Sequence, residues 1–86
     1  MFEIHFSTKA KKELDKIEEK YRRRVGEVLR ILMVDPIPAR LFDVKKLAGT
    51  ENTFRIRIGK IRIVYTILWK DKVILISRIS FRGRVY

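Results

Sequence analysis

Two runs of alternating apolar and polar residues flank the dipeptide Gly59-Lys60. The apolar positions of the two runs are Phe54, Ile56, Ile58, Ile61, Ile63 and Tyr65. Alternation with a period of two is typical of strands that bury one face, and glycine readily supplies the positive φ that a tight turn requires. The sequence therefore predicts a β-hairpin with Gly59 and Lys60 as its loop.

A two-residue loop fixes which residues oppose each other across the hairpin. The opposed pairs are Ile58 with Ile61, Arg57 with Arg62, Ile56 with Ile63, and Arg55 with Val64. Every isoleucine then lies on one face, and Arg55, Arg57 and Arg62 lie on the other. Because opposed like charges destabilise a strand pair by about 0.2 to 1 kcal/mol, stability alone does not explain this pattern.

Three guanidinium groups on one sheet face predict a site for a multiply charged anion, since each presents a planar fork of donors that matches phosphate oxygens. A phosphodiester is the leading candidate ligand. The alternative is a solvated polar sheet face without a ligand. The segment from Asn52 to Lys70 contains no acidic residue that could neutralise the arginines, which favours the anion site.

The net charge also favours an anionic partner. The 86 residues include 21 Lys and Arg against 10 Asp and Glu, a formal charge of +11. Residues 52–86 contain nine basic residues and one acidic residue, which leaves +8 in that part and +3 in the rest. A surface with this concentration of one sign suits nucleic acid, an anionic membrane or an acidic protein.

Several function classes are excluded by composition. The chain has no cysteine and one histidine, which leaves no disulfide framework, cysteine metal cluster or two-histidine zinc site, so we expect no metal or other cofactor. Its apolar stretches are too short for a membrane span. The first ten residues lack the pattern of a secretory signal, and we expect a cytoplasmic protein.

The first half of the chain predicts a short strand over residues 2–6 and two amphipathic helices, with Ser7 or Thr8 as the first N-cap. Apolar residues at helical spacing are Ala10, Leu14, Ile17, Tyr21, Val25, Val28, Leu29 and Leu32. Asp35-Pro36 ends the second helix. The apolar stripes are expected to form the core, and the run from Arg22 to Arg24 is expected to be a solvated helix face rather than an RNA contact.

The C-terminal part predicts a strand through Ile67–Trp69 and a returning strand over Val73–Ile79. Four consecutive apolar residues begin the return, so loops of two and three residues fit equally well and the facing of Ser77 and Arg78 stays open. The returning strand leads back toward Arg57 and Arg62, and we expect Arg82 and Arg84 to arrive near them.

Together these elements predict an α+β fold in one domain over residues 1–86. A short N-terminal strand and a two-helix hairpin precede an antiparallel sheet of three to four strands, which packs on the helices. Three segments then match a known family: FDVKKLxG at 42–49, FRIRIGxxRIVY at 54–65 and RGRxY at 82–86. With this order of elements, the chain resembles RelE-type toxins of the RelE/ParE superfamily, especially archaeal ones.

The resemblance implies a microbial-RNase-like fold and an endoribonuclease that enters the ribosomal A site and cuts messenger RNA there. It also implies a RelB-type antitoxin that wraps around the toxin and holds it inactive. Matched position by position, the family's basic and aromatic site residues fall on Arg55, Arg57, Arg62, Arg82 and Tyr86. Better-studied bacterial relatives have lysines at the first two positions and continue into a C-terminal helix.

RNA can be cut without metal by attack of its own 2′-oxygen on the neighbouring phosphorus. We expect Arg62 and Arg82 to stabilise the charge added at phosphorus. Further expected phosphate and ribosomal RNA contacts are Arg55, Arg57, Arg84, Lys45 and Lys46, the two lysines in a loop that leads to the sheet. Since a guanidinium is a poor proton acceptor, Tyr86 is expected either as the general base or as an aromatic that stacks on a nucleobase.

Two other functions stay open at this point. A noncatalytic RNA-binding module could use the same arginines, and a relative within the superfamily could act on DNA gyrase. In each toxin case we expect an acidic antitoxin that is partly disordered before binding, because such a segment can neutralise the arginines and add a helix or strand along the domain.

Overall fold

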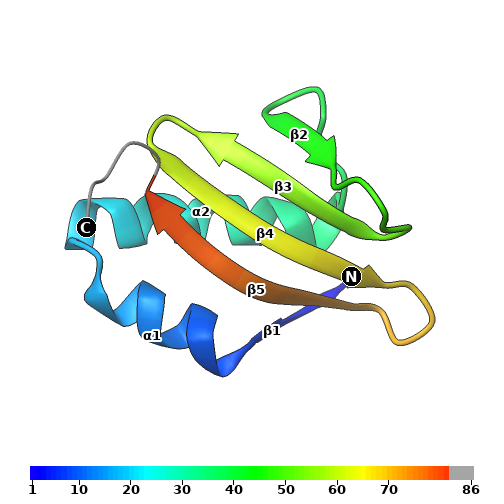
Figure 1. Cartoon of the computed structure of the whole chain (residues 1–86), viewed down its shortest axis with the longest axis horizontal. Coiled ribbons are helices and arrows are strands. Elements are labelled where there is room, and N and C mark those ends of the chain that lie inside the picture. The colour runs from blue at the N-terminus through cyan, green and yellow to red at the C-terminus, as the bar shows by residue number, and fades with distance from the viewer. Residues whose placement is uncertain (82–86) are drawn as a thin grey trace.

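The structure, a computed structural model, describes residues 1–81. The elements in chain order are β1 (Glu3–Phe6), α1 (Thr8–Lys16), α2 (Glu19–Val34), β2 (Asp43–Lys46), β3 (Thr53–Ile58), β4 (Ile61–Leu68) and β5 (Val73–Phe81) (Figure 1). The strands form one five-stranded sheet in the order β1-β5-β4-β3-β2. Neither helix is long and apolar enough to cross a membrane.

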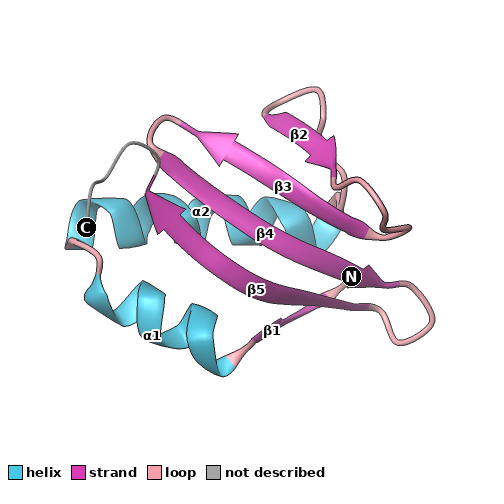
Figure 2. Ribbon diagram, viewed as in Figure 1, coloured by secondary structure: helices cyan, strands magenta, loops and turns pink. Residues whose placement is uncertain are grey.

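The expected α+β fold is confirmed, but the sheet has five strands and is mixed, rather than three to four antiparallel strands. The strand predicted through Ile67–Trp69 is the end of β4. Strands β2 to β5 are antiparallel neighbours, whereas β1 pairs parallel with β5. Figure 2 shows strands of the sheet passing in front of α2, so α2 covers one face of the sheet. Ala10 of α1 packs in the same core. The core between these layers includes Val25, Val28 and Leu32 of α2 and the inward isoleucines of the sheet.

The helical hairpin forms where the apolar spacing predicts it. Ser7 is the N-cap of α1, and its hydroxyl accepts the Ala10 N–H at 3.0 Å. The guanidinium of Arg22 donates to carbonyl oxygens at the end of α1, including that of Ile17 at 3.0 Å. Arg23 and Arg24 pair with glutamates on their own helix. The three arginines are therefore exposed to solvent, as expected for a solvated helix face, and their side chains contact groups of the same helical hairpin.

The register predicted for the β3–β4 hairpin is confirmed residue by residue. Arg57 opposes Arg62, Ile56 opposes Ile63, and Gly59 has a φ of 58° in the loop. Ile56 and Ile63 are fully buried. Burial of this one face fixes the register, because a slip of one residue would bring the arginines into the core.

The β4–β5 connection differs from the expected two or three residues. β4 ends at Leu68 and β5 begins at Val73, so four residues form the loop and Trp69 lies in it. A β-bulge then interrupts the pairing, with Ser77 as the extra residue between Ile76 and Arg78. Because of the bulge, both Ile76 and Ile79 face the core although they are three residues apart. Buried and exposed residues therefore do not alternate regularly along β5, and the sequence pattern could not predict which residues face the core.

Buried Tyr65 anchors the segment that leads from α2 to β2. Its hydroxyl donates to the carbonyl oxygen of Pro36 at 2.8 Å. Burial, and secondarily the negative charge of Asp35, raise the pKa of Tyr65, so the phenol stays a neutral donor.

We predict opposite effects for two glycine-to-alanine substitutions. Gly59→Ala places a side chain at positive φ and should destabilise the protein by about 1 to 2 kcal/mol. Gly26→Ala should stabilise it by about 0.8 to 1 kcal/mol, since Gly26 is inside α2 and an added Cβ would meet no atom closer than Arg30 Nη1 at 4.0 Å. Urea unfolding measures both, and equal effects of the same sign would contradict the assigned turn.

Candidate nucleic-acid interface

Arg55, Arg57 and Arg62 lie on the sheet face that points away from the helices, and we call this group the arginine face. Side chains alternate along a strand, and the neighbours of these arginines, such as Ile56 and Ile63, pack in the helix-covered core. The sequence prediction that the hairpin gathers three guanidiniums on one face is thus realised in the register of β3 and β4.

The arginines are partly withdrawn from solvent. The side chain of Arg55 is 18% exposed and that of Arg57 is 36% exposed. The Nε and Nη2 atoms of Arg55 and the Nε atom of Arg62 are buried without a hydrogen-bond partner among the described residues. Shielded donors of this kind interact strongly with an anion, because less water competes for them.

A carboxylate also reaches the arginine face, which the sequence reasoning missed. Asp43 Oδ2 lies 2.9 Å from Arg57 Nη2, and Asp43 Oδ1 lies 3.2 Å from Arg55 Nη2. The segment from Asn52 to Lys70 contains no acidic residue, and the inference that no carboxylate neutralises the arginines was therefore wrong. Asp43 comes from β2, outside that segment, and strand pairing brings it across from Arg57.

The neutralisation is incomplete. Three formal positive charges meet one negative charge, and in the part of the chain that the structure describes Arg62 forms no ion pair.

Asp43 could have been found from the alternation of Phe42 and Val44 around it, which indicates a strand. The six residues between β2 and β3 leave its register undetermined from the sequence.

The two lysines of the sequence prediction separate in the structure. Both lie in β2 rather than in a loop. Lys45 is the partner of Arg55 and shares its face, whereas Lys46 is the partner of buried Phe54 and belongs to the opposite face. Lys45 therefore extends the arginine face toward the sheet edge.

The remaining predicted site residues, Arg82, Arg84 and Tyr86, lie outside the described residues. The expected return of β5 toward Arg62 is confirmed, because Ser80 opposes Arg62 and Phe81 opposes Ile61. The chain thus reaches residue 81 beside the arginine face.

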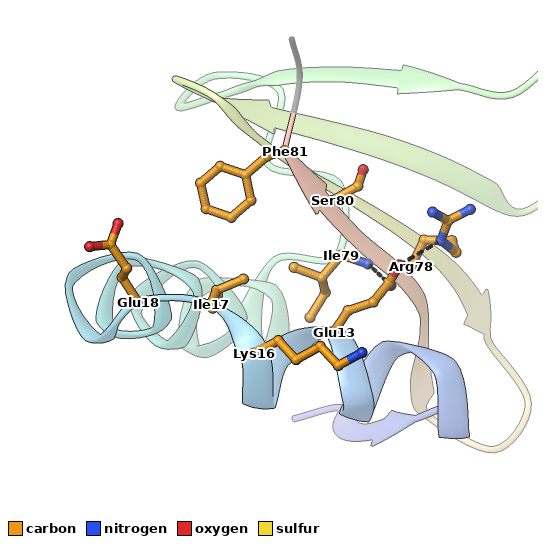
Figure 3. A pocket seen from close by; sticks show the side chains of 8 residues that line it. All are labelled: Glu13, Lys16, Ile17, Glu18, Arg78, Ile79, Ser80 and Phe81. Carbon is orange, nitrogen blue, oxygen red and sulfur yellow. Dashed lines mark hydrogen bonds and ion pairs between the residues drawn. The ribbon is translucent and has the colours of Figure 1, made fainter. Parts of the chain in front are cut away.

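A groove of about 430 Å³ lies between α1 and the end of β5, as Figure 3 shows. Glu13 in this groove accepts the Ile79 N–H at 2.7 Å and the Arg78 Nε–H at 3.0 Å. The facing of Arg78, left open by the sequence, follows from the register: Arg78 is the partner of Val64, which is itself the partner of Arg55, so its position belongs to the outward sheet face. Its guanidinium pairs with Glu13 of α1. Lys16 and Glu18 complete a lining of mixed sign, so the groove suits phosphate less well than the arginine face.

Comparison with known proteins agrees with this geometry. The family described as the ParE toxin of the type II toxin-antitoxin system, parDE, matches residues 4–86. The chain belongs to this toxin family. Within it, the chain is 34% identical to the protein named RelE1 of Methanocaldococcus jannaschii over 85 residues, which covers 99% of this chain and 94% of that protein.

Solved structures show the same relationship. The RelE-RelB complex of Pyrococcus horikoshii has a RelE-like chain with 36% identity and a TM-score of 0.84, with 98% of each chain covered. The isolated RelE toxin of E. coli has 22% identity and a TM-score of 0.84 over 99% of this chain and 88% of that chain, which shows the shared fold. The expected RelE-type toxin of a toxin-antitoxin system is thereby confirmed.

Inorganic phosphate should raise the melting temperature of this toxin more than sodium chloride does at equal ionic strength. A ligand specific for the folded state stabilises it by about 1.4 kcal/mol at ten times its Kd. The double variant Arg57→Gln, Arg62→Gln should lose most of this increase in a thermal melt. The matched control, the double variant Arg23→Gln, Arg24→Gln on α2, should keep the phosphate-dependent rise in melting temperature. Equal losses of this rise in both variants would show that phosphate responds only to net charge and does not bind the arginine face.

Proposed function

We propose that this toxin is an endoribonuclease that cleaves messenger RNA in the ribosomal A site without a metal and inhibits translation in this way. The 2′-oxygen loses its proton and bonds to the adjacent phosphorus, the bond from phosphorus to the 5′-oxygen of the next nucleotide breaks, and that oxygen leaves with a proton. The observation that carries the proposal is the arginine face, where three guanidiniums meet a single carboxylate on a sheet face that the helices leave open. The relatives named RelE support the same branch of the family.

Each arginine has a distinct role in this proposal. Arg62, which has no carboxylate partner among residues 1–81, stabilises the negative charge that the attack adds at phosphorus. Arg55 and Arg57 bind the backbone phosphates beside the scissile bond and set its orientation. Preorganised donors of this kind act mainly on the transition state, because they cost no reorganisation when the charge develops.

The proposal also gives roles to predicted residues beyond Phe81. Arg82 acts with Arg62 at phosphorus, and Arg84 adds a phosphate contact. Tyr86 either removes the 2′ proton or stacks on a nucleobase, a contact worth about 1 to 3 kcal/mol in single-strand binding. Lys45, at the edge of the arginine face, and Lys46 contact ribosomal RNA, where positive charge contributes affinity and steering without sequence recognition.

We expect cleavage to depend on Arg62 and Arg82. Arg62→Ala and Arg82→Ala should each lower the cleavage rate by about 10² to 10³, the usual cost of losing one electrostatic donor to a transition state. In vitro translation with mapping of message ends measures the effect, with codon-phased cuts in ribosome-bound message as the signature. Arg23→Ala, on an exposed part of α2, is the control and should cleave normally.

Two outcomes would favour other functions. Undiminished inhibition of translation by both folded variants would remove catalysis and favour a noncatalytic RNA-binding module. The ParE description of the family favours DNA gyrase as the second candidate target, and inhibition of gyrase supercoiling without message cleavage would establish it.

Tyr86→Phe separates the two roles of the terminal phenol. If the ring acts by stacking, the variant should keep nearly full cleavage activity, because only the hydroxyl is removed. A loss of about 10²-fold or more in the maximal rate would instead assign the phenol to proton transfer.

A short acidic antitoxin should bind this toxin and suppress its activity. An acidic, partly disordered segment can neutralise the arginine face while it folds along the domain. We expect a neighbouring reading frame to encode such a protein, and coexpression to restore growth to cells that make the toxin. Growth arrest that persists in a stable complex of the two proteins would contradict neutralisation of the site.

A further inference from the structure

One carboxylate bridges two of the three arginines. Asp43 uses a separate oxygen for each partner, Oδ2 for Arg57 and Oδ1 for Arg55, at 2.9 and 3.2 Å. Among residues 1–81, Asp43 is the acidic side chain that pairs with the arginine face. The other ion pairs of these residues lie on the helices, on β1 or in the groove between α1 and β5.

The bridge is a consequence of strand register. Asp43 is directly opposite Arg57 in the β2–β3 pair, and Arg55 is two residues away on the same face. Diagonal neighbours on one sheet face are about 7 to 8 Å apart at their Cα atoms, which a long arginine side chain spans easily. A single carboxylate at this one position of β2 can therefore reach both guanidiniums.

Both arginines need a counter-charge at this place. Arg57 opposes the like charge of Arg62 across β3 and β4. Arg55 is largely buried, and its Nε and Nη2 atoms are shielded from solvent. A shielded cation without a partner is strongly unfavourable, so Asp43 offsets part of this cost and holds the ends of the two guanidiniums on the β2 side of the cluster.

We propose that Asp43 is a positioning residue of the nuclease site: it fixes Arg55 and Arg57 for phosphate binding and leaves Arg62 as the guanidinium that receives the scissile phosphate. Asp43 contacts one terminal nitrogen of each arginine. A guanidinium has five N–H donors, so Arg57 keeps most of its donors for a second anion, whereas the Nε and Nη2 donors of Arg55 are buried. Asp43 is 41% exposed and Arg57 is 36% exposed, which leaves the pair open to a ligand. This inference rests on the proposed endoribonuclease function.

Asp43→Asn tests the role, because it removes the charge and keeps the size. RNA affinity should rise, by up to about fivefold at low salt, since one negative charge near the phosphates is gone. The maximal cleavage rate at saturating toxin should nevertheless fall by about 10²-fold, because misplaced binding groups are costly at the transition state. Affinity and rate thus move in opposite directions.

Asp71→Asn is the matched control. Asp71 lies exposed in the β4–β5 loop and pairs with no cation among the described residues. The change in net charge is the same, so RNA affinity should rise slightly while the cleavage rate stays at the wild-type value. If Asp43→Asn does not fold, Asp43→Thr carries the same measurements with a side chain that strands favour.

Two results would overturn the inference. An increase in both affinity and rate would make Asp43 a competitor of the substrate phosphate, and an unchanged rate would leave it without a role in positioning. A further readout does not depend on cleavage: ¹⁵N relaxation of the arginine Nε–Hε groups should show Arg55 and Arg57 ordered in the wild type and in Asp71→Asn, but mobile in Asp43→Asn. Wild-type protein that cleaves no message, yet shows this ordering, would refute the proposed function alone.

Discussion

Arg57 and Arg62 oppose each other directly across the β3–β4 hairpin, and the rest of the site depends on how the fold tolerates this contact. Two like charges at the shortest cross-strand spacing are unfavourable. The opposite face of the same hairpin buries Ile56, Ile61 and Ile63, and each buried isoleucine contributes about 1.5 to 3 kcal/mol. Burial therefore exceeds the repulsion severalfold and fixes the arginines in register.

The compensation is uneven across the arginine face, and in the proposed function this asymmetry determines where phosphate binds most strongly. Asp43 offsets the charges of Arg55 and Arg57 on the β2 side, while Arg62 on β4 faces Ser80 of β5. A phosphate that approaches the sheet finds its strongest uncompensated attraction at Arg62. The end of β5 lies beside this position.

Physical reasons explain which parts of this structure could be predicted from the sequence. The hairpin was predictable in full because a two-residue loop leaves one register, and strict alternation identifies the buried face. The β4–β5 pairing was not predictable, because four consecutive apolar residues from Val73 to Ile76 do not show which of them face the core. The bulge at Ser77 then shifts the register by one residue. Asp43 was missed because charges counted along a segment ignore residues that strand pairing brings from elsewhere. The general base of the proposed reaction does not follow from residue types alone, since Arg55 and Arg57 are poor proton acceptors.

The most direct test of this account is an electron cryomicroscopy structure of the toxin on a ribosome whose A-site message carries a 2′-O-methyl group and cannot be cut. The account predicts that the arginine face is turned to the message, with a phosphate oxygen within about 3.2 Å of the Arg62 guanidinium. A toxin that presents its helices to the message, or whose arginine face lies on ribosomal RNA away from it, would contradict the account.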